Sequence, residues 1–197
     1  MSDEHALADP QIEGQVQHDE PELDPEAAAR RAEALAQVRK FGDPALRTRA
    51  REVERFDEAL RNEVRRMAAI MDGALGVGLA APQLGVLHRV LVYRVPPALE
   101  PATLVNPEIE WAGREQEIAE EGCLSLPGVL VEVERPIHVR VRGRNDLGEG
   151  VVMEASGLEA RVVQHEIDHL DGVLILDRTT REQRKEAMRM LREAQAA

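Results

Sequence analysis

The sequence predicts an α+β fold in which antiparallel sheets pack around a central helix, with a further helix at the C-terminus. Three observations support this class. Residues 137–142 alternate apolar and polar side chains, as a strand with one buried face does. Turn signals stand at Pro96-Pro97 and at Asn145-Asp146. The pattern lacks repeated strand-helix units, which argues against a parallel α/β sheet.

The helices are justified in chain order by composition and by spacing. Residues 25–35 are rich in helix formers and begin with a proline, which suits a first helical turn. Apolar residues recur at helical spacing over 57–71, the segment 157–170 forms the central helix, and a charged stretch from residue 178 forms the last one. Three segments are predicted to be strands: Arg89 to Val95, Ala102 to Glu110 and Ile137 to Arg142.

The first 28 residues differ in composition from the rest of the chain. They contain nine carboxylates and no Lys or Arg, and so contribute nine of the twelve net negative charges. We therefore expect an acidic, mobile tail over 1–28, to which no function is assigned, and one folded domain over 29–197. A domain of that length can enclose a single hydrophobic core.

Composition also excludes several functional classes. Aromatic residues make up only 2% of the chain, too few for an RNA-binding sheet that stacks bases on its side chains, so sequence-specific nucleic-acid binding is not expected. No apolar run approaches the roughly 18 residues that suggest a membrane span, and the acidic start has no signal-peptide core. We expect a cytoplasmic monomer with no membrane partner.

The strongest motif is Gln-His-Glu-Ile-Asp-His-Leu at residues 164–170, inside the predicted central helix. Helical spacing places His165 and His169 one turn apart on one face, with Glu166 beside them. Two neutral imidazoles hold a divalent cation, and a neighbouring carboxylate can take a proton from water. The motif therefore indicates a hydrolytic metal site, although a surface helix with two histidines is the plain alternative.

A catalytic site of this kind needs a third protein ligand. In the extended zinc-peptidase pattern a third histidine would stand at position 175, which here is Ile175. Glu182 and Glu186 are carboxylate candidates, but they lie in a charged stretch that is expected to be a solvated helix. The remaining candidate is Cys123, the only cysteine of the chain.

Cys123 lies in Glu-Glu-Gly-Cys-Leu-Ser-Leu-Pro-Gly at residues 120–128. Glycine and proline bracket this segment, so we expect it to be short and irregular, with backbone N–H groups free to face a ligand. A thiolate here would complete a Cys-His-His site. A small buried hydrophobic residue is the structural alternative, and the local sequence leaves both open.

A third segment, residues 76–83, reads Gly-Val-Gly-Leu-Ala-Ala-Pro-Gln. Its small residues allow a substrate backbone to approach closely, and it ends in a carboxamide; taken alone it is equally compatible with a tight packing corner. Together the three segments resemble the signatures of the polypeptide deformylases, GxGLAAPQ, EGCLS and QHExDHL. All twenty positions match or fall on a free position, and the resemblance extends from about Lys40 to the C-terminal helix.

The resemblance implies hydrolysis of the N-formyl group from formylmethionyl nascent polypeptides, with release of formate, by a deformylase-like catalytic domain over 29–197. By the family pattern Cys123, His165 and His169 hold one metal ion, and water takes the fourth position. Glu166 would accept the proton of the attacking water and then deliver it to the leaving nitrogen.

The same resemblance assigns residues around the reacting group. The side-chain amide of Gln83 and the backbone N–H of Leu124 are expected to stabilise the oxyanion. Val77 and Gly78 would hold the peptide backbone like an added strand. The apolar slot for methionine points to Val77, Leu124 and Val162, for which ordinary core packing is equally compatible with the sequence.

The metal identity is less constrained than its ligands. Cys-His-His donors accept several divalent ions, and Zn(II) outcompetes Fe(II) on affinity alone. The resemblance suggests Fe(II) as the native ion, with zinc, nickel or cobalt able to take the same site. We also expect Glu121 and Arg135 to form a supporting ion pair near Cys123.

The C-terminal stretch is basic in an acidic chain. From Arg178 onward, six basic residues accompany three glutamates, a local charge of +3 on a chain of −12. A solvated amphipathic helix accounts for this pattern. Because some deformylases dock through a basic terminal helix, the resemblance also suggests transient contact with the ribosome.

Two other functional classes use similar residues. A metallopeptidase would cut internal amide bonds, and Cys123→Ala should then leave metal binding intact. A non-catalytic zinc module needs neither Glu166 nor Gln83 and keeps no open coordination position.

Overall fold

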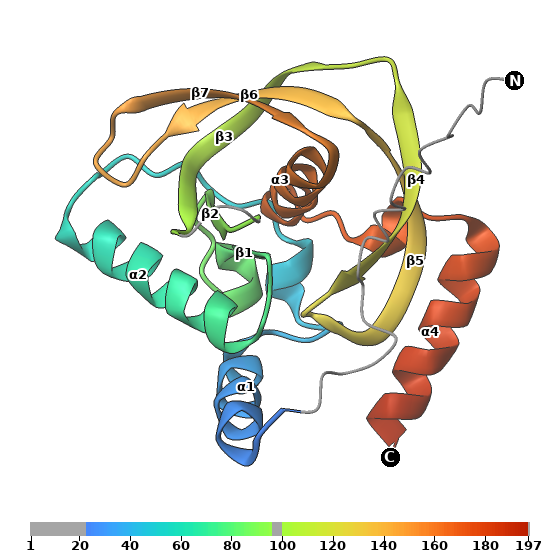
Figure 1. The fold of residues 1–197 in the computed structure, drawn as a ribbon. Helices are drawn as coiled ribbons and strands as arrows, with labels where there is room; N and C mark the ends of the chain where they lie inside the picture. The colour runs from blue at the N-terminus through green and yellow to red at the C-terminus, as the bar shows by residue number, and fades with distance from the viewer. Residues whose placement is uncertain (1–22, 96–99, 197) are drawn as a thin grey trace, which may run out of the picture.

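In the computed structural model, which describes residues 23–95 and 100–196, antiparallel strands surround one central helix (Figure 1). The α+β class predicted from the sequence is therefore confirmed. Along the chain the elements are α1 (Pro25–Gln37), η1 (Pro44–Arg47), α2 (Glu58–Gly73), β1 (Gly78–Ala80), η2 (Ala81–Leu84), β2 (Val90–Tyr93), β3 (Ala102–Ala112), β4 (Gln116–Cys123), β5 (Leu126–Pro136), β6 (His138–Arg144), β7 (Gly150–Ser156), α3 (Gly157–Leu170), η3 (Ile175–Asp177) and α4 (Arg181–Ala196).

The strands form two antiparallel sheets. Five of them make one sheet in the order β1-β2-β3-β6-β7, and β4 pairs with β5 in a separate hairpin. In β6 the side chains of Val139 and Val141 are buried, whereas those of Arg140 and Arg142 are exposed. This alternation, which the sequence predicts, turns one face of the sheet toward the core and the other toward solvent.

Helix α3 occupies the centre of the molecule, between the five-stranded sheet and the β4–β5 hairpin (Figure 1). From Ala160 to Leu170 only His165 is not fully buried. A helix enclosed in this way cannot solvate its polar side chains, so each of them needs a partner within the protein. Those partners build the site described below.

The remaining helices pack on the outside of this arrangement. Asp24 caps α1 by accepting a backbone N–H from the first turn at 2.8 Å, and Ala34 joins the core beneath α2. The helix begins at Pro25, as the sequence predicts. The expected tail boundary at residue 28 therefore falls within α1, and residues 1–22 lie outside the described residues.

Helix α4 lies along β5 (Figure 1). Ala187 and Leu191 are buried in the same core cluster as the inner face of β5, while the charged side chains of the helix are exposed. The amphipathic helix expected from Arg178 onward is thus confirmed. Within the described residues, no helix has both the length and the apolar character that a bilayer span requires.

The predicted strands correspond to β2, β3 and β6, and the turn at Asn145-Asp146 joins β6 to β7. The turn at Pro96-Pro97 lies outside the described residues. One expectation was wrong: residues 120–128 are not an irregular segment but the end of a hairpin, in which only Leu124 and Ser125 form the turn. Because β4 is largely exposed, it lacks the alternating apolar side chains from which a strand is predicted.

Candidate active site

Two imidazoles extend from one face of α3. His165 and His169 stand one turn apart, with ring centroids separated by 4.9 Å in an edge-to-face arrangement. The His169 residue is only 1% exposed, and 12% of the His165 side chain is exposed. The helical spacing of the motif therefore produces the pair that the sequence predicts.

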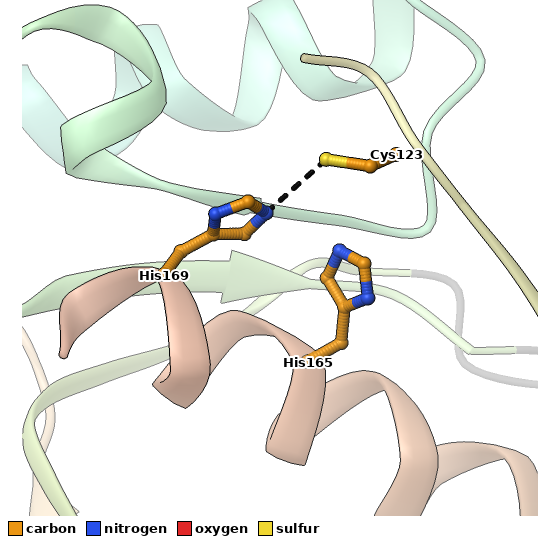
Figure 2. A group of neighbouring side chains, drawn as sticks. All are labelled: Cys123, His165 and His169. Atoms are coloured by element: carbon orange, nitrogen blue, oxygen red, sulfur yellow. Dashed lines mark hydrogen bonds between the residues drawn. The ribbon is translucent and has the colours of Figure 1, made fainter. Parts of the chain in front are cut away.

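Cys123, the last residue of β4, faces these imidazoles (Figure 2). Its Sγ lies 3.3 Å from Nε2 of His169, and one donor atom from each of Cys123, His165 and His169 lies within 4.8 Å of the others. Burial raises the pKa of the Cys123 thiol, but the neighbouring His169 and His165 imidazoles outweigh it and hold that pKa well below its usual value. The sulfur is therefore poised as a thiolate, the form in which cysteine binds metals.

This Cys-His-His cluster fits a divalent transition metal. A thiolate and two imidazoles are donors that such ions accept, and three protein ligands leave a fourth tetrahedral position open. Nδ1 of His165 donates to a carboxylate oxygen of Glu121 at 2.9 Å. Because a carboxylate only accepts, Nδ1 of His165 carries a proton, so Nε2 is the ring nitrogen available to bind a metal.

Glu166 lies beside the cluster, and one of its two carboxylate oxygens has no hydrogen bond within the described part of the chain. The residue is 4% exposed, and Oε2 has no partner among the described residues. Burial raises the pKa of this carboxyl group, although His165 and His169 act in the opposite direction. An unpaired buried carboxylate oxygen is costly, and such groups concentrate where proton transfer takes place.

Gln83, in η2, presents its amide to the same place. Oε1 accepts the backbone N–H of Ala80 at 2.9 Å, which identifies the oxygen end of the amide. Nε2 then points toward Oγ of Ser125 at 3.3 Å and Sγ of Cys123 at 3.7 Å. The residue is 2% exposed, so its N–H groups form a fixed donor pair beside the metal cluster.

Leu124 occupies the turn that follows Cys123, and its carbonyl oxygen accepts a hydrogen bond from Nζ of Lys40 at 3.0 Å. The segment around Lys40 also binds the neighbouring elements through its backbone. The N–H of Arg39 donates to the carbonyl of Gln83 at 2.7 Å, and the N–H of Phe41 donates to that of Ser125 at 2.9 Å. Residues 39–41 thus tie η2 to the β4–β5 turn.

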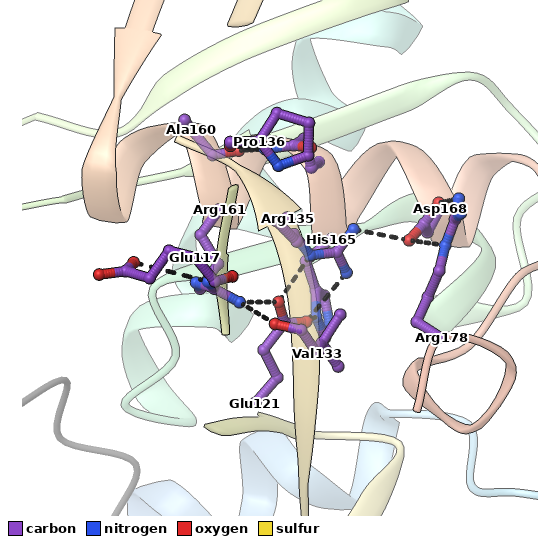
Figure 3. Close-up of polar contacts among 11 residues, drawn as sticks. Glu117, Glu121, Val133, Arg135, Pro136, Ala160, Arg161, His165, Asp168 and Arg178 are labelled. Atoms are coloured by element: carbon purple, nitrogen blue, oxygen red, sulfur yellow. Dashed lines mark hydrogen bonds and ion pairs between the residues drawn. The ribbon is translucent and has the colours of Figure 1, made fainter. Parts of the chain in front are cut away.

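An ionic network centred on Glu121, which binds His165, lies next to the cluster (Figure 3). Arg135 binds Glu121 through two hydrogen bonds, of 2.6 and 2.9 Å, which confirms the ion pair expected from the sequence. Arg135 also donates to Asp168 at 2.9 Å, and Asp168 in turn accepts from Arg178. Burial raises the pKa of the Glu121 carboxyl, but hydrogen bonds from Arg135 and His165 outweigh it and hold that pKa far below its usual value.

The expected substrate-binding residues have three different surroundings. Gly78 is buried directly over Glu166, and Val77, which precedes edge strand β1 by one residue, is 46% exposed. Leu124 packs partly buried against the core beneath α2. Val162 is 6% exposed and lies among the core residues between α3 and the sheet, so core packing accounts for its burial.

Sequence reasoning missed three residues of the ionic network around Glu121: Arg161, Asp168 and Arg178. Asp168 was part of the matched motif but was given no structural function. The available signal was the burial expected of a central helix, because a charged residue there must meet an opposite charge or several hydrogen-bond partners. Which partners they meet depends on residues far away in the chain.

The sequence profile of the polypeptide deformylase family matches residues 35–185. The peptide deformylase of Acidothermus cellulolyticus is 49% identical over 164 residues, which cover 83% of this chain and 89% of that protein. The peptide deformylase of Thermotoga neapolitana is 53% identical over 144 residues, covering 73% and 87% respectively.

Solved structures agree with these sequence matches. The peptide deformylase of Thermotoga maritima superposes with a TM-score of 0.70 at 49% identity, covering 73% of this chain and 96% of that one. The peptide deformylase of Synechococcus elongatus, solved in complex with actinonin, superposes with a TM-score of 0.75 at 41% identity, covering 78% and 85%. The chain therefore belongs to the polypeptide deformylase family and is a hydrolase that acts on N-formylmethionyl peptides.

Proposed function

We propose that this protein removes the formyl group from N-formylmethionyl nascent polypeptides by metal-dependent hydrolysis, with Glu166 as general base and then general acid. One observation carries the proposal. A buried carboxylate with an unpartnered oxygen lies directly beside three converging metal-binding side chains, Cys123, His165 and His169. Neither a structural metal site nor ordinary core packing accounts for that carboxylate.

Cys123, His165 and His169 are proposed to hold one divalent ion, which would act as a Lewis acid and lower the pKa of water. The ion is proposed to be Fe(II), and the same thiolate and imidazole donors also accept zinc, nickel or cobalt. The hydrogen bond from His165 to Glu121 supports this assignment, because it orients the ring and fixes its tautomer for metal binding.

Glu166 then moves the proton. Its carboxylate accepts a proton from the water that attacks the formyl carbon, and this attack forms a tetrahedral intermediate with a negative oxygen. As the carbon–nitrogen bond breaks, Glu166 delivers the same proton to the nitrogen. Formic acid then loses its hydroxyl proton to the amine or to solvent, so the products are formate and the free amino group of methionine, and the carboxylate is ready for another cycle.

The negative oxygen needs donors that are already in position. The amide N–H of Gln83 is held by the contacts of its own oxygen, and the backbone N–H of Leu124 follows directly after the ligand Cys123. Donors fixed before the charge develops stabilise the transition state without reorganisation, and removing one such donor typically costs about 10²–10³ in kcat.

The peptide is proposed to bind along β1, at Val77 and Gly78. Strand β1 is an edge of the five-stranded sheet, since β2 covers only one of its sides. An extended peptide can therefore add to the free side as a further strand. Val77, Leu124 and Val162 are proposed to line the pocket for the methionine side chain.

Formylated chains emerge from ribosomes in the cytoplasm, and we propose that this protein acts there as a monomer. We further propose transient contact with the ribosome through the basic face of α4. Arg181, Lys185 and Arg192 are exposed on that helix, and RNA phosphates attract such a surface.

The decisive test is release of formate from formyl-Met-Ala-Ser. Acetyl-Met-Ala-Ser and a longer unformylated peptide, assayed for cleavage of an internal bond, are the controls. We expect formate release from the formylated peptide and no cleavage of the others. Cys123→Ala should lower metal affinity severely. Cleavage of the internal bond, with metal binding retained in Cys123→Ala, would instead indicate a metallopeptidase.

A further inference from the structure

Arg161 lies on α3 one turn before His165, and both side chains reach the same carboxylate (Figure 3). Nη1 of Arg161 donates to Oε1 of Glu121 at 2.9 Å, while Nδ1 of His165 donates to Oε2 at 2.9 Å. With the two bonds from Arg135, each oxygen of Glu121 accepts two hydrogen bonds. Residues at positions i and i+4 share a helix face, so one face of α3 holds Glu121 at two points.

Arg161 also reaches both strands of the hairpin that carries Cys123. Nη1 donates to the carbonyl of Val133 in β5 at 2.9 Å, and Nη2 donates to the carbonyl of Glu117 in β4 at 2.9 Å. The guanidinium group is buried, with 9% of the side chain exposed. A planar group with fixed donors that binds three acceptors permits little relative movement of the elements that provide them.

These contacts connect the two halves of the Cys-His-His cluster. Helix α3 supplies His165 and His169, whereas Cys123 comes from β4, two residues beyond Glu121. Of the three arginines in the network, Arg161 alone lies on α3 itself and binds backbone carbonyls on both hairpin strands. It therefore links the helix that carries the two imidazoles to both strands of the hairpin that carries the thiolate.

Arg161 differs from Arg135 in that the buried carboxylates of the network do not depend on it for charge compensation. Glu121 and Asp168 keep Arg135 and Arg178 as partners when Arg161 is removed. Loss of Arg161 therefore leaves neither Glu121 nor Asp168 without a cation, and so avoids the strong destabilisation that an uncompensated buried charge would cause. What is lost is the link from α3 to the backbone of both hairpin strands, whereas the bonds His165–Glu121, Asp168–Arg135 and Gln164–Pro136 between α3 and the hairpin remain.

We propose that Arg161 is a positioning residue that fixes the geometry of the metal cluster by joining α3 to both strands of the Cys123 hairpin through Glu121, Val133 and Glu117. The inference rests on the metal site of the proposed function. The described hydrogen bonds of Arg161 go to Glu121, Val133 and Glu117 and not to Cys123, His165 or His169, so its effect on the metal ligands passes through Glu121 and the hairpin.

The test uses the full chain and Co(II) as a probe. Co(II) affinity is measured by competition with a chelator, and the thiolate-to-cobalt absorption band reports the geometry at Cys123. Arg161→Met keeps the length of the side chain without its donors, Arg161→Lys keeps the charge and part of the hydrogen bonding, and Arg140→Met, at an exposed position of β6, is the matched control.

We expect Arg161→Met to bind Co(II) about 10- to 100-fold more weakly with an altered absorption band, the usual effect of losing a group that supports a ligand. Arg161→Lys should recover part of the affinity, and Arg140→Met should match the wild type. A folded Arg161→Met with wild-type affinity and spectrum would overturn the proposal. If Arg161→Met does not fold, wild-type affinity and spectrum in Arg161→Lys would overturn it equally. Failure of the wild type to bind Co(II) would instead refute the metal site itself.

Discussion

Gly78 lies so close to Glu166 that any larger residue at position 78 would displace the carboxylate. A Cβ at position 78 would stand 2.4 Å from Oε1 of Glu166. Contacts under 3.0 Å force one group to move, and here the group that yields is the proposed proton acceptor. The second glycine of the first signature segment, Gly78, is therefore explained by the space that Glu166 occupies.

Gly78→Ala should consequently lower kcat by about 10- to 100-fold, because a displacement of roughly 1 Å at a reacting group is enough for such a loss. Metal content should not change, since Cys123, His165 and His169 keep their places. Gly150→Ala, where nothing lies within 4 Å of the added Cβ, is the control. A wild-type kcat in Gly78→Ala would mean that Glu166 tolerates displacement.

Glu166→Ala should leave metal binding near stoichiometric and reduce formate release by roughly two to four orders of magnitude. The water would lose its proton acceptor and the leaving nitrogen its donor. Glu166→Gln serves as a second variant, because it preserves the volume of the side chain but cannot accept the proton. Metal content and turnover are measured on the same folded sample. Near-native turnover would contradict the acid-base assignment, and loss of metal would make Glu166 a ligand or a support.

The Fe(II) assignment predicts sensitivity to oxygen. Aerobic purification should progressively inactivate the enzyme through oxidation of the metal or of the Cys123 thiolate, and reconstitution with nickel should restore stable turnover. The half-life of activity is compared in air and under argon for both metal forms. Equal half-lives in the iron form with and without oxygen would exclude iron as the native ion.

The N-terminal region should divide functionally at α1. Deleting residues 1–22 should leave turnover of a short, nearly neutral peptide within a few-fold, since no matched motif lies there. Deletion through residue 28 also removes the Asp24 cap of α1, at a cost of about 1 kcal/mol of folding stability. Deletion through residue 37 removes Ala34 from the core and should lower the unfolding temperature further. A large loss of activity in the shortest deletion would show that the tail acts on the site.

Ribosome contact is best tested by charge rather than by truncation. Because Ala187 and Leu191 are buried against β5, deleting α4 would expose the core beneath it. Arg181→Glu with Lys185→Glu should instead weaken cosedimentation with ribosomes several-fold and reduce its salt dependence, while turnover of a short peptide is unchanged. Arg140→Glu with Arg142→Glu on β6 reverses the same number of charges. Equal loss in both pairs would indicate a general charge effect and not docking through α4.

The sequence by itself determined the local geometry of the site. His165 and His169 share a face because they are four residues apart on a helix, and the helix predicted over 157–170 has the same ends in the structure. The alternation at 137–142 likewise located β6. Each of these predictions depends only on the period of one element, which neighbouring residues in the chain determine.

Only the tertiary structure decided how the parts of the site meet. The sequence left Cys123 open between a ligand and a packing residue, and the β4–β5 hairpin brought its sulfur to 3.3 Å from His169. The same holds for Arg161, whose partner Glu121 lies 40 residues earlier in the chain. Periodicity cannot identify such partners, because a buried charge requires compensation but does not specify which distant residue provides it. The packing of α3 against the hairpin determines which distant residue compensates each buried charge.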